Sequence, residues 1–326
     1  MTLLVEPPDG RLDAALDVAR RAPSAHNAQP WQLRWDRGCL SVSLSPIRAL
    51  RAGDPSGRQN TLSVGAFLEY LTIAAAEQGL TATIDPWNPG FHPGLLATVT
   101  MAEDGVDDLR RRLVPALRTR QTVRGFHDRL LPVGLLESLS EVADNYEPHL
   151  DVVTDRDAVD RIGSMVEEGN RAAFGLPAMR RELSEMVSWA RDKNRRGMSI
   201  ESMFPDRELP NVRSASDAIL TMDGADEARR IGDWYREAPA LLIVSTMYDG
   251  PEAWIASGRL AVALMLEASL VGVSHCISAA PVEVPNLVPR LRAEIQGARR
   301  PQVLMRIGMA SKGGELPRIE TEELFG

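Results

Sequence analysis

A repeated pattern of helix, glycine and strand constrains the fold of this 326-residue chain more than any other feature. Residues 61–84 have a helical apolar pattern that stops at Gly79 and continues as a strand, and residues 253–278 repeat this order around Gly272. At an offset of 193 residues the two segments share five identities: Gly65, Leu71, Ala75, Gly79 and Ile84 match Gly258, Leu264, Ala268, Gly272 and Ile277. The pattern indicates an internal duplication. Chance similarity of two Ala- and Leu-rich helices is the alternative.

The remaining pattern predicts a mixed α+β fold. A hairpin is expected around residues 36–38, strands over residues 95–101, 241–247 and 303–309, and a basic helix over about 106–118. Because the offset exceeds half the chain, the second copy must contain extra sequence. The obvious extra piece, at about residues 178–211, begins with a helical pattern over 179–195. It is interpreted as a lid over a site, with a solvated helical excursion as the alternative.

Composition excludes several classes of function. The formal net charge of −8 and pI near 5.3 argue against a nucleic-acid partner, which would need a basic face. Only Cys39 and Cys276 are present, and the five histidines show no metal-ligand spacing, so neither disulfides nor a metal site are expected. The start of the chain lacks a signal-peptide pattern, and residues 260–273 contain Glu267 and suggest a buried helix rather than a membrane span. We expect a cytoplasmic protein with a small-molecule substrate.

Residues 22–31 form a polar loop of sequence APSAHNAQPW. Ser24, Asn27 and Gln29 offer neutral donors and acceptors on a loop stiffened by proline, which suits recognition of a uracil-like ring edge or a sugar hydroxyl. In the simpler interpretation, Asn27 caps a turn. His26 either approaches a substrate or points away from it. From the residues alone, this is one polar loop among many.

A second candidate element is residues 120–126, of sequence RQTVRGF. Arg120 and Arg124 flank the hydroxyl of Thr122, and guanidinium groups match phosphate oxygens in geometry and charge. The segment could therefore clamp a phosphate, or it could be a solvated basic stretch. No Gly-x-Gly-x-x-Gly or P-loop motif occurs anywhere in the chain.

The loop at residues 22–31 resembles the Ala-x-Ser-x-x-Asn-x-Gln-Pro-Trp motif of nitroreductase-type flavoproteins, and residues 120–126 resemble the Arg-Arg-Ser-x-Arg-x-Phe signature that opens such chains. In ordinary members the signature precedes the loop, and both occur in every subunit of a homodimer. Here the order is reversed and each element occurs once. This arrangement is similar to the Acg-like branch, whose two-repeat proteins hold one flavin mononucleotide (FMN) and carry a lid.

The resemblance implies an α+β, nitroreductase-like fold duplicated within one chain, an intramolecular pseudo-dimer with an antiparallel-dominated sheet flanked by helices. It implies a first repeat over residues 1–118 and a second over 119–326, with the lid inserted at about 178–211. The dimer interface would then be internal, which is compatible with a monomer. The implied FMN contacts are Pro23, Ser24, Asn27, Gln59, Arg120, Gln121, Thr122, Arg124, Pro281, Val282, Lys312 and Arg318. Gln121 replaces the usual second Arg or His, and the family's Lys-x-Arg spacing near Lys312 is absent.

The implied activity is FMN-dependent oxidoreduction, with hydride passing from NAD(P)H or an organic donor to a small organic acceptor. The flavin performs this chemistry, so no catalytic side chain is assigned. Two alternatives remain. One is an FMN-sequestering or sensing protein closed by its lid, and the other is a tailoring dehydrogenase that is reduced by its own substrate.

Overall fold

The computed structural model describes residues 10–36, 38–86, 94–103, 105–125, 130–192, 195–205, 212–310 and 316–325. The longer helices are α1 (Arg11–Ala19), α2 (Arg58–Glu77), α4 (Leu135–Ala143), α5 (Arg156–Phe174), α6 (Pro177–Glu185), α9 (Gly224–Arg236) and α10 (Pro251–Leu270). The short helices are α3 (Asp108–Leu113), α7 (Ile200–Met203), α8 (Ala215–Thr221), α11 (Ala280–Glu283) and α12 (Val288–Arg292). The strands are β1 (Trp31–Asp36), β2 (Cys39–Leu44), β3 (Thr81–Pro86), β4 (Leu95–Ala102), β5 (His149–Val153), β6 (Val187–Ser188), β7 (Met198–Ser199), β8 (Ala240–Thr246), β9 (Ser274–Ser278) and β10 (Arg300–Gly308).

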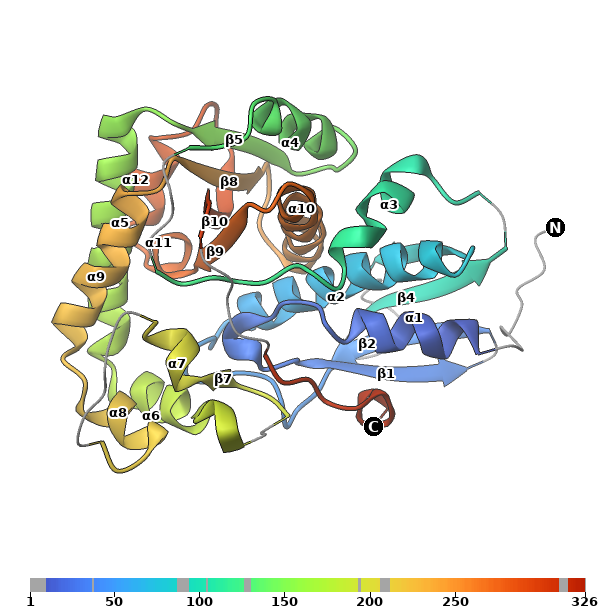
Figure 1. The fold of residues 1–326 in the computed structure, drawn as a ribbon, viewed down its shortest axis with the longest axis horizontal. Coiled ribbons are helices and arrows are strands. Elements are labelled where there is room, and N and C mark those ends of the chain that lie inside the picture. The colour runs from blue at the N-terminus through green and yellow to red at the C-terminus, as the bar shows by residue number, and fades with distance from the viewer. Residues whose placement is uncertain are drawn as a thin grey trace.

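Two four-stranded sheets with the same topology form the framework (Figure 1). Their strand orders are β1-β2-β4-β3 and β5-β8-β10-β9, and all neighbouring strands are antiparallel. Counted along the chain, both sheets have the order first, second, fourth, third. In each half a 20-residue helix, α2 or α10, connects the second strand to the third. The expected α+β class with antiparallel sheets flanked by helices is confirmed.

The two long helices cross at a pair of glycines. A Cβ atom added to Gly65 would lie 2.2 Å from the carbonyl oxygen of Ile255, and one added to Gly258 would lie 2.1 Å from that of Leu62. At the offset of 193 residues, Gly258 is the counterpart of Gly65 and Ile255 that of Leu62, so the contact is reciprocal. Reciprocity of this kind is characteristic of a two-fold axis. It supports the proposed duplication.

Helix α10 lies inside the molecule although it is long and apolar enough to cross a membrane by length and composition. In its most apolar window, 72% of the residues are buried inside the fold. Its neighbours in the largest apolar cluster come from both halves of the chain, among them Phe67 and Leu71 of α2 and Val303 of β10. The expectation of a buried helix here is confirmed.

Two helices are shorter than expected. The basic helix expected over residues 106–118 is limited to α3 and a 3-10 turn, because Pro115 lacks the N–H that a continued α-helix would need. The helical pattern over 179–195 ends at Glu185, and Val187 and Met198 then pair in a small parallel ladder. Both of these residues are buried, so tertiary packing overrides the local pattern here.

Residues 177–223, here called the insertion segment, form a unit between α5 and α9 (Figure 1). The segment is built from α6, β6, β7, α7 and α8, and it has an apolar cluster of its own. Members of this cluster include Leu183, Ile200, Phe204 and Ile219. The expected lid range, about 178–211, lies within this segment, although residues 193–194 and 206–211 are outside the described part of the chain.

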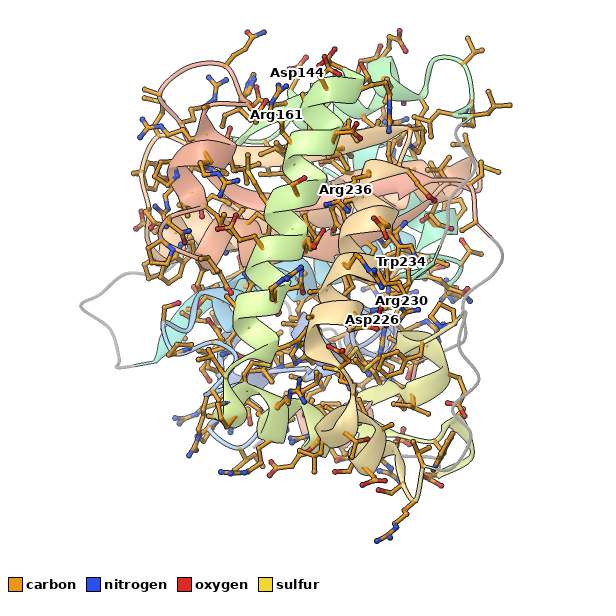
Figure 2. The ribbon with its side chains drawn as sticks, turned by 90° about the vertical axis from the view of Figure 1, so that its left-hand side faces the viewer. Asp144, Arg161, Asp226, Arg230, Trp234 and Arg236 are labelled. Atoms are coloured by element: carbon orange, nitrogen blue, oxygen red, sulfur yellow. The ribbon has the colours of Figure 1, made fainter. Side chains whose placement is uncertain are left out.

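Helices α5 and α9 pack side by side and carry the insertion segment (Figure 2). Trp234 of α9 lies between two guanidinium groups, with Arg230 4.5 Å and Arg306 5.5 Å from its ring centroid. Arg230 also lies 5.4 Å from the ring centroid of Phe204, which belongs to the insertion segment. Stacked cations and rings therefore connect this segment to β10 of the second sheet.

We expect Gly65→Ala and Gly258→Ala to destabilise the protein to a similar extent. Each added methyl group would overlap a backbone carbonyl, which cannot move without separating α2 from α10. Overpacking of this kind costs about 1–3 kcal/mol, whereas Gly to Ala in an open helix position gains roughly 1 kcal/mol. Urea unfolding measures whether each substitution lowers or raises the free energy of unfolding. A gain of stability in either variant would contradict the close crossing.

Candidate functional site

The loop at residues 22–31 has a strained backbone. Within the described residues, the non-glycine residues with a positive φ are His26 (49°), Asn27 (54°) and Gln29 (52°), and all three belong to this loop. Side chains other than glycine rarely adopt this conformation, which costs roughly 1–3 kcal/mol per residue. Ser24 stabilises the turn, because its Oγ accepts a hydrogen bond from the Gln29 N–H at 2.9 Å, and Pro23 is half-buried beside it.

Asn27 connects this loop to two distant segments. Its side-chain amide donates to the carbonyl oxygens of Gly197, at 2.8 Å, and Pro317, at 2.9 Å, while its Oδ1 accepts from Arg318. Its own carbonyl accepts from the Gly197 N–H at 3.1 Å. Asn27 is 3% exposed and therefore acts as a junction between the loop, the insertion segment and the C-terminal tail.

Arginines surround a small cavity next to this junction. The cavity measures about 30 Å³, and its lining consists of Arg21, Leu117, Arg120, Gln121, Thr122, Leu316 and Arg318. Arg120 reaches it with its Nε bonded to the Tyr70 hydroxyl at 2.7 Å and its Nη1 bonded to Thr122 Oγ1 at 3.3 Å. The predicted residues Arg120, Gln121, Thr122 and Arg318 thus meet in space, although about 200 residues separate the last from the others.

Two of these arginines, Arg120 and Arg318, have no carboxylate partner within the described residues. Arg120 donates to Tyr70, Thr122 and the Arg21 carbonyl, and Arg318 donates to Asn27 and two backbone carbonyls. The Nε of Arg318 is buried and has no hydrogen-bond partner. Burial, together with the nearby Arg120 guanidinium, lowers the pKa of Arg318 to about 9. Such a cluster is a ready receptor for an anion.

Arg124 contacts a different group from Arg120. Its Nη2 contacts Met198 Sδ of the insertion segment at 3.2 Å, and it does not line the cavity. His26 lies in the same region, where burial and the Arg124 guanidinium lower its pKa to about 4. Of the two arginines of the predicted clamp, Arg120 lines this cavity and Arg124 does not.

Gln59 and the turn at Pro281 and Val282 form a separate polar group. Gln59 lies in the first turn of α2 and shares a hydrogen bond with Glu283, the residue that follows Val282 in α11. Arg58 is 3% exposed and has its Nη1 4.0 Å from Glu283 Oε1, and neither atom has a hydrogen-bond partner. Burial raises the pKa of Glu283 to about 7, against the opposing effects of the Gln59 hydrogen bond and the Arg58 charge.

Several residues of these groups were missed by sequence reasoning. Arg21 directly precedes the loop motif, and that proximity was a usable signal. Tyr70 and Arg58 lie on α2, and only the fold shows that they approach the site. Lys312, a predicted phosphate contact, lies outside the described residues.

The raised pKa of Glu283 predicts a stability difference that depends on pH. The pKa of Glu283 in the folded protein, about 7, lies above its ordinary value of 4.5. Between these two pH values the unfolded chain loses the Glu283 proton more readily than the folded protein does, so the free energy of unfolding falls as pH rises from about 4.5 to 7. Relative to wild type, Glu283→Gln should therefore become more stable over this range and reach a plateau above pH 7. Chemical unfolding at several pH values measures this, with the exposed Glu185→Gln as the control. A difference that does not change with pH would contradict the assignment.

Comparisons with known proteins agree with this arrangement. No family model matches the chain. The chain is 25% identical to the protein named "Putative NAD(P)H nitroreductase acg" of Mycobacterium tuberculosis, over 96% of this chain and 95% of that protein. It is 27% identical to a second M. tuberculosis protein with the same description, over 95% and 88% respectively.

Among solved structures, the chain is similar to the FMN- and NADPH-dependent nitroreductase NfnB from sphigopyxis sp. strain HMH, with a TM-score of 0.45 and 18% identity. This match covers 66% of the chain and 97% of that protein. The two sequence matches span almost the whole chain. Over almost its whole length the chain is therefore similar to proteins described as putative NAD(P)H nitroreductases, Acg among them.

Proposed function

We propose that this protein is an FMN-dependent oxidoreductase, which passes hydride between NAD(P)H or an organic donor and a small organic acceptor. The observation that carries the proposal is the arginine cavity, which is joined to the strained loop through the contact between Arg318 and Asn27. The loop at residues 22–31 and the segment at residues 120–126, which contributes to the cavity lining, resemble in sequence the two halves of one flavin site. Relatives described as NAD(P)H nitroreductases support the same activity.

The cavity fits the phosphate of FMN. Arg120 and Arg318 supply guanidinium donors without carboxylate partners among the described residues, Thr122 supplies a hydroxyl, and Arg318 Nε is a buried donor without an acceptor. A volume of about 30 Å³ holds roughly two water molecules, which is the scale of a small polar group such as a phosphate. FMN would supply the hydride chemistry when bound. The chain binds the phosphate, orients the cofactor and excludes water.

We further propose that residues 1–118 and 119–326 are two nitroreductase-like repeats. The matching sheet orders and the reciprocal glycine contact support this division. The loop would come from the first repeat and the Arg120 segment from the second, so one chain would build one site and act as a monomer in the cytoplasm. Pro23, Ser24, Gln59, Arg124, Pro281, Val282 and Lys312 remain proposed cofactor contacts.

A second candidate function is FMN sequestration or sensing. The observation that favours it is the position of the insertion segment, which packs against the loop through Asn27 and through Met186, a neighbour of Ala28 and Leu50. A cover held in this position would exclude water and also slow the entry of nicotinamide. In this case the insertion segment would keep FMN bound and would not regulate its reduction.

We expect Arg120→Ala and Arg318→Ala each to weaken FMN binding about 10- to 100-fold, because a hydrogen bond to a charged group contributes about 1.5–3 kcal/mol. Quenching of flavin fluorescence on binding measures the dissociation constant. Arg118→Ala is the matched control, because Arg118 is exposed and pairs with Glu77. Unchanged affinity for FMN in the Arg120 and Arg318 variants would contradict the proposal that the FMN phosphate binds in this cavity.

Anaerobic mixing of the FMN-loaded protein with NAD(P)H separates the two candidate functions. An oxidoreductase that uses nicotinamide should lose its absorbance near 450 nm rapidly, at about 1–1,000 per second, as for typical turnover. A storage protein should retain its oxidised spectrum for minutes. Protein that carries no flavin and binds none when FMN is added would overturn both proposals.

A further inference from the structure

A carboxylate of the insertion segment is bound by backbone N–H groups of a different part of the chain. Glu182, on α6, accepts hydrogen bonds from the N–H groups of Arg51 at 2.7 Å, Ala52 at 3.0 Å and Gly53 at 2.7 Å. These three successive residues belong to the loop that connects β2 to α2. Successive N–H groups that converge in this way form a concave anion site, usually called a nest.

The nest stabilises the ionised form of Glu182. Burial alone would raise the pKa of this carboxyl group, yet the three backbone donors outweigh burial and hold the pKa below its usual range. Hydrogen bonds to a charged group are the strong ones, roughly twice as strong as neutral ones. Because the donors are backbone groups already fixed by the loop, the contact costs entropy only for the Glu182 side chain.

Apart from the hydrogen bonds of Asn27 and Gln29 to Gly197 and Arg195, several other contacts of the insertion segment with the rest of the chain are exposed or small. Arg195 pairs with Glu323 at 2.6 Å, but both side chains are about half exposed, and surface pairs of this kind contribute roughly 0–1 kcal/mol. Arg196 donates to the Ile47 carbonyl at 3.2 Å from an exposed position. Met186 adds a small apolar contact with Ala28 and Leu50. Among the described contacts, Glu182 contributes the only carboxylate held by three backbone donors.

The nest lies next to the strained loop. A Cβ atom added to Gly53 would lie 3.0 Å from Glu182 Oε2 and 3.9 Å from His26 Cε1. Gly53 thus leaves room for the carboxylate and for the imidazole of the loop at residues 22–31. Release of Glu182 would free α6 from the same surface that Asn27 and Gln29 share with Gly197 and Arg195.

We propose that Glu182 is the latch that holds the insertion segment closed over the loop at residues 22–31. The latch opens when the carboxylate leaves the nest, and its strength sets how often a donor or acceptor can reach the site. This consequence for access rests on the proposed flavin function, whereas the latch itself does not.

Hydrogen–deuterium exchange on the full chain without added FMN tests the latch. Glu182→Gln keeps the shape of the side chain and removes its charge, and we expect amide exchange at residues 51–53 and in α6 to accelerate about tenfold, the change expected for the loss of one charged hydrogen bond. Glu185→Gln is the control, because it removes the same charge from an exposed position of the same helix. Exchange in Glu182→Gln equal to that in Glu185→Gln would overturn the latch.

A second variant tests the same contact from the opposite side. Gly53→Val places a side chain where the carboxylate now lies and leaves the charge of Glu182 intact, so it should accelerate exchange in α6 as Glu182→Gln does. Protection of α6 equal to wild type in this variant would also contradict the latch.

Flavin reduction then tests access. In FMN-loaded protein, Glu182→Gln should be bleached by NADPH about tenfold faster than wild type or Glu185→Gln. Equal rates would overturn the role in access. If wild type binds no FMN, the proposed function fails, and the exchange experiment still decides the latch.

Discussion

The close crossing of α2 and α10 is the constraint on which the rest of the structure depends. Backbone meets backbone at Gly65 and Gly258, so the two helices approach more closely than side chains would allow. Each helix is covered by the sheet of its own half, and the shared apolar cluster extends through both halves. Tyr70, on the same α2 helix, then orients Arg120 from the other half through a hydrogen bond. The distance between the halves therefore also fixes the distance between the two parts of the candidate site.

In the candidate site, Arg120 and Arg318 have no carboxylate partner among the described residues. Buried polar groups in proteins usually have partners, and one buried acid of the described chain has several. Glu69, which is fully buried, is bound by Arg110, Arg259 and the Tyr146 hydroxyl. Arg318, by contrast, is buried next to Arg120 and has a depressed pKa. Glu69 thus belongs to a structural ion cluster, whereas the arginine cavity is the part of the described chain that we propose as a phosphate site.

The sequence predicted the architecture well because its periodic segments are long. The strands that were predicted and the two 20-residue helices lie within a few residues of their expected positions, since burial of one face and a terminal glycine determine where each element begins and ends. Strands β5, β6 and β7 were not predicted. The predicted helix over residues 179–195 was wrong in its second half, because Val187 and Met198 pair across a loop and are buried together. Local periodicity contains no information on such a contact.

Site residues were predictable where a motif marked them and not where the fold alone assembles them. Arg120, Thr122 and Arg318 were found through motif resemblance, and the structure places them around one cavity. The contact of Arg124 with Met198 could not be foreseen, because it depends on where the insertion segment lies. Glu182 has no motif at all. Its proposed role depends on three backbone N–H groups, and because backbone groups do not depend on residue type, no sequence pattern marks this contact.

The insertion segment has a consequence for how this protein can change over evolutionary time. In a dimer of identical chains, every insertion appears twice and covers both symmetry-related faces. Here both sheets belong to one chain, and the segment at residues 177–223 occurs only in the second half, between α5 and α9. A single gene can therefore reshape one face and leave the opposite face as it was. Asymmetry of this kind allows one half to specialise in covering the site while the other keeps the framework that holds it.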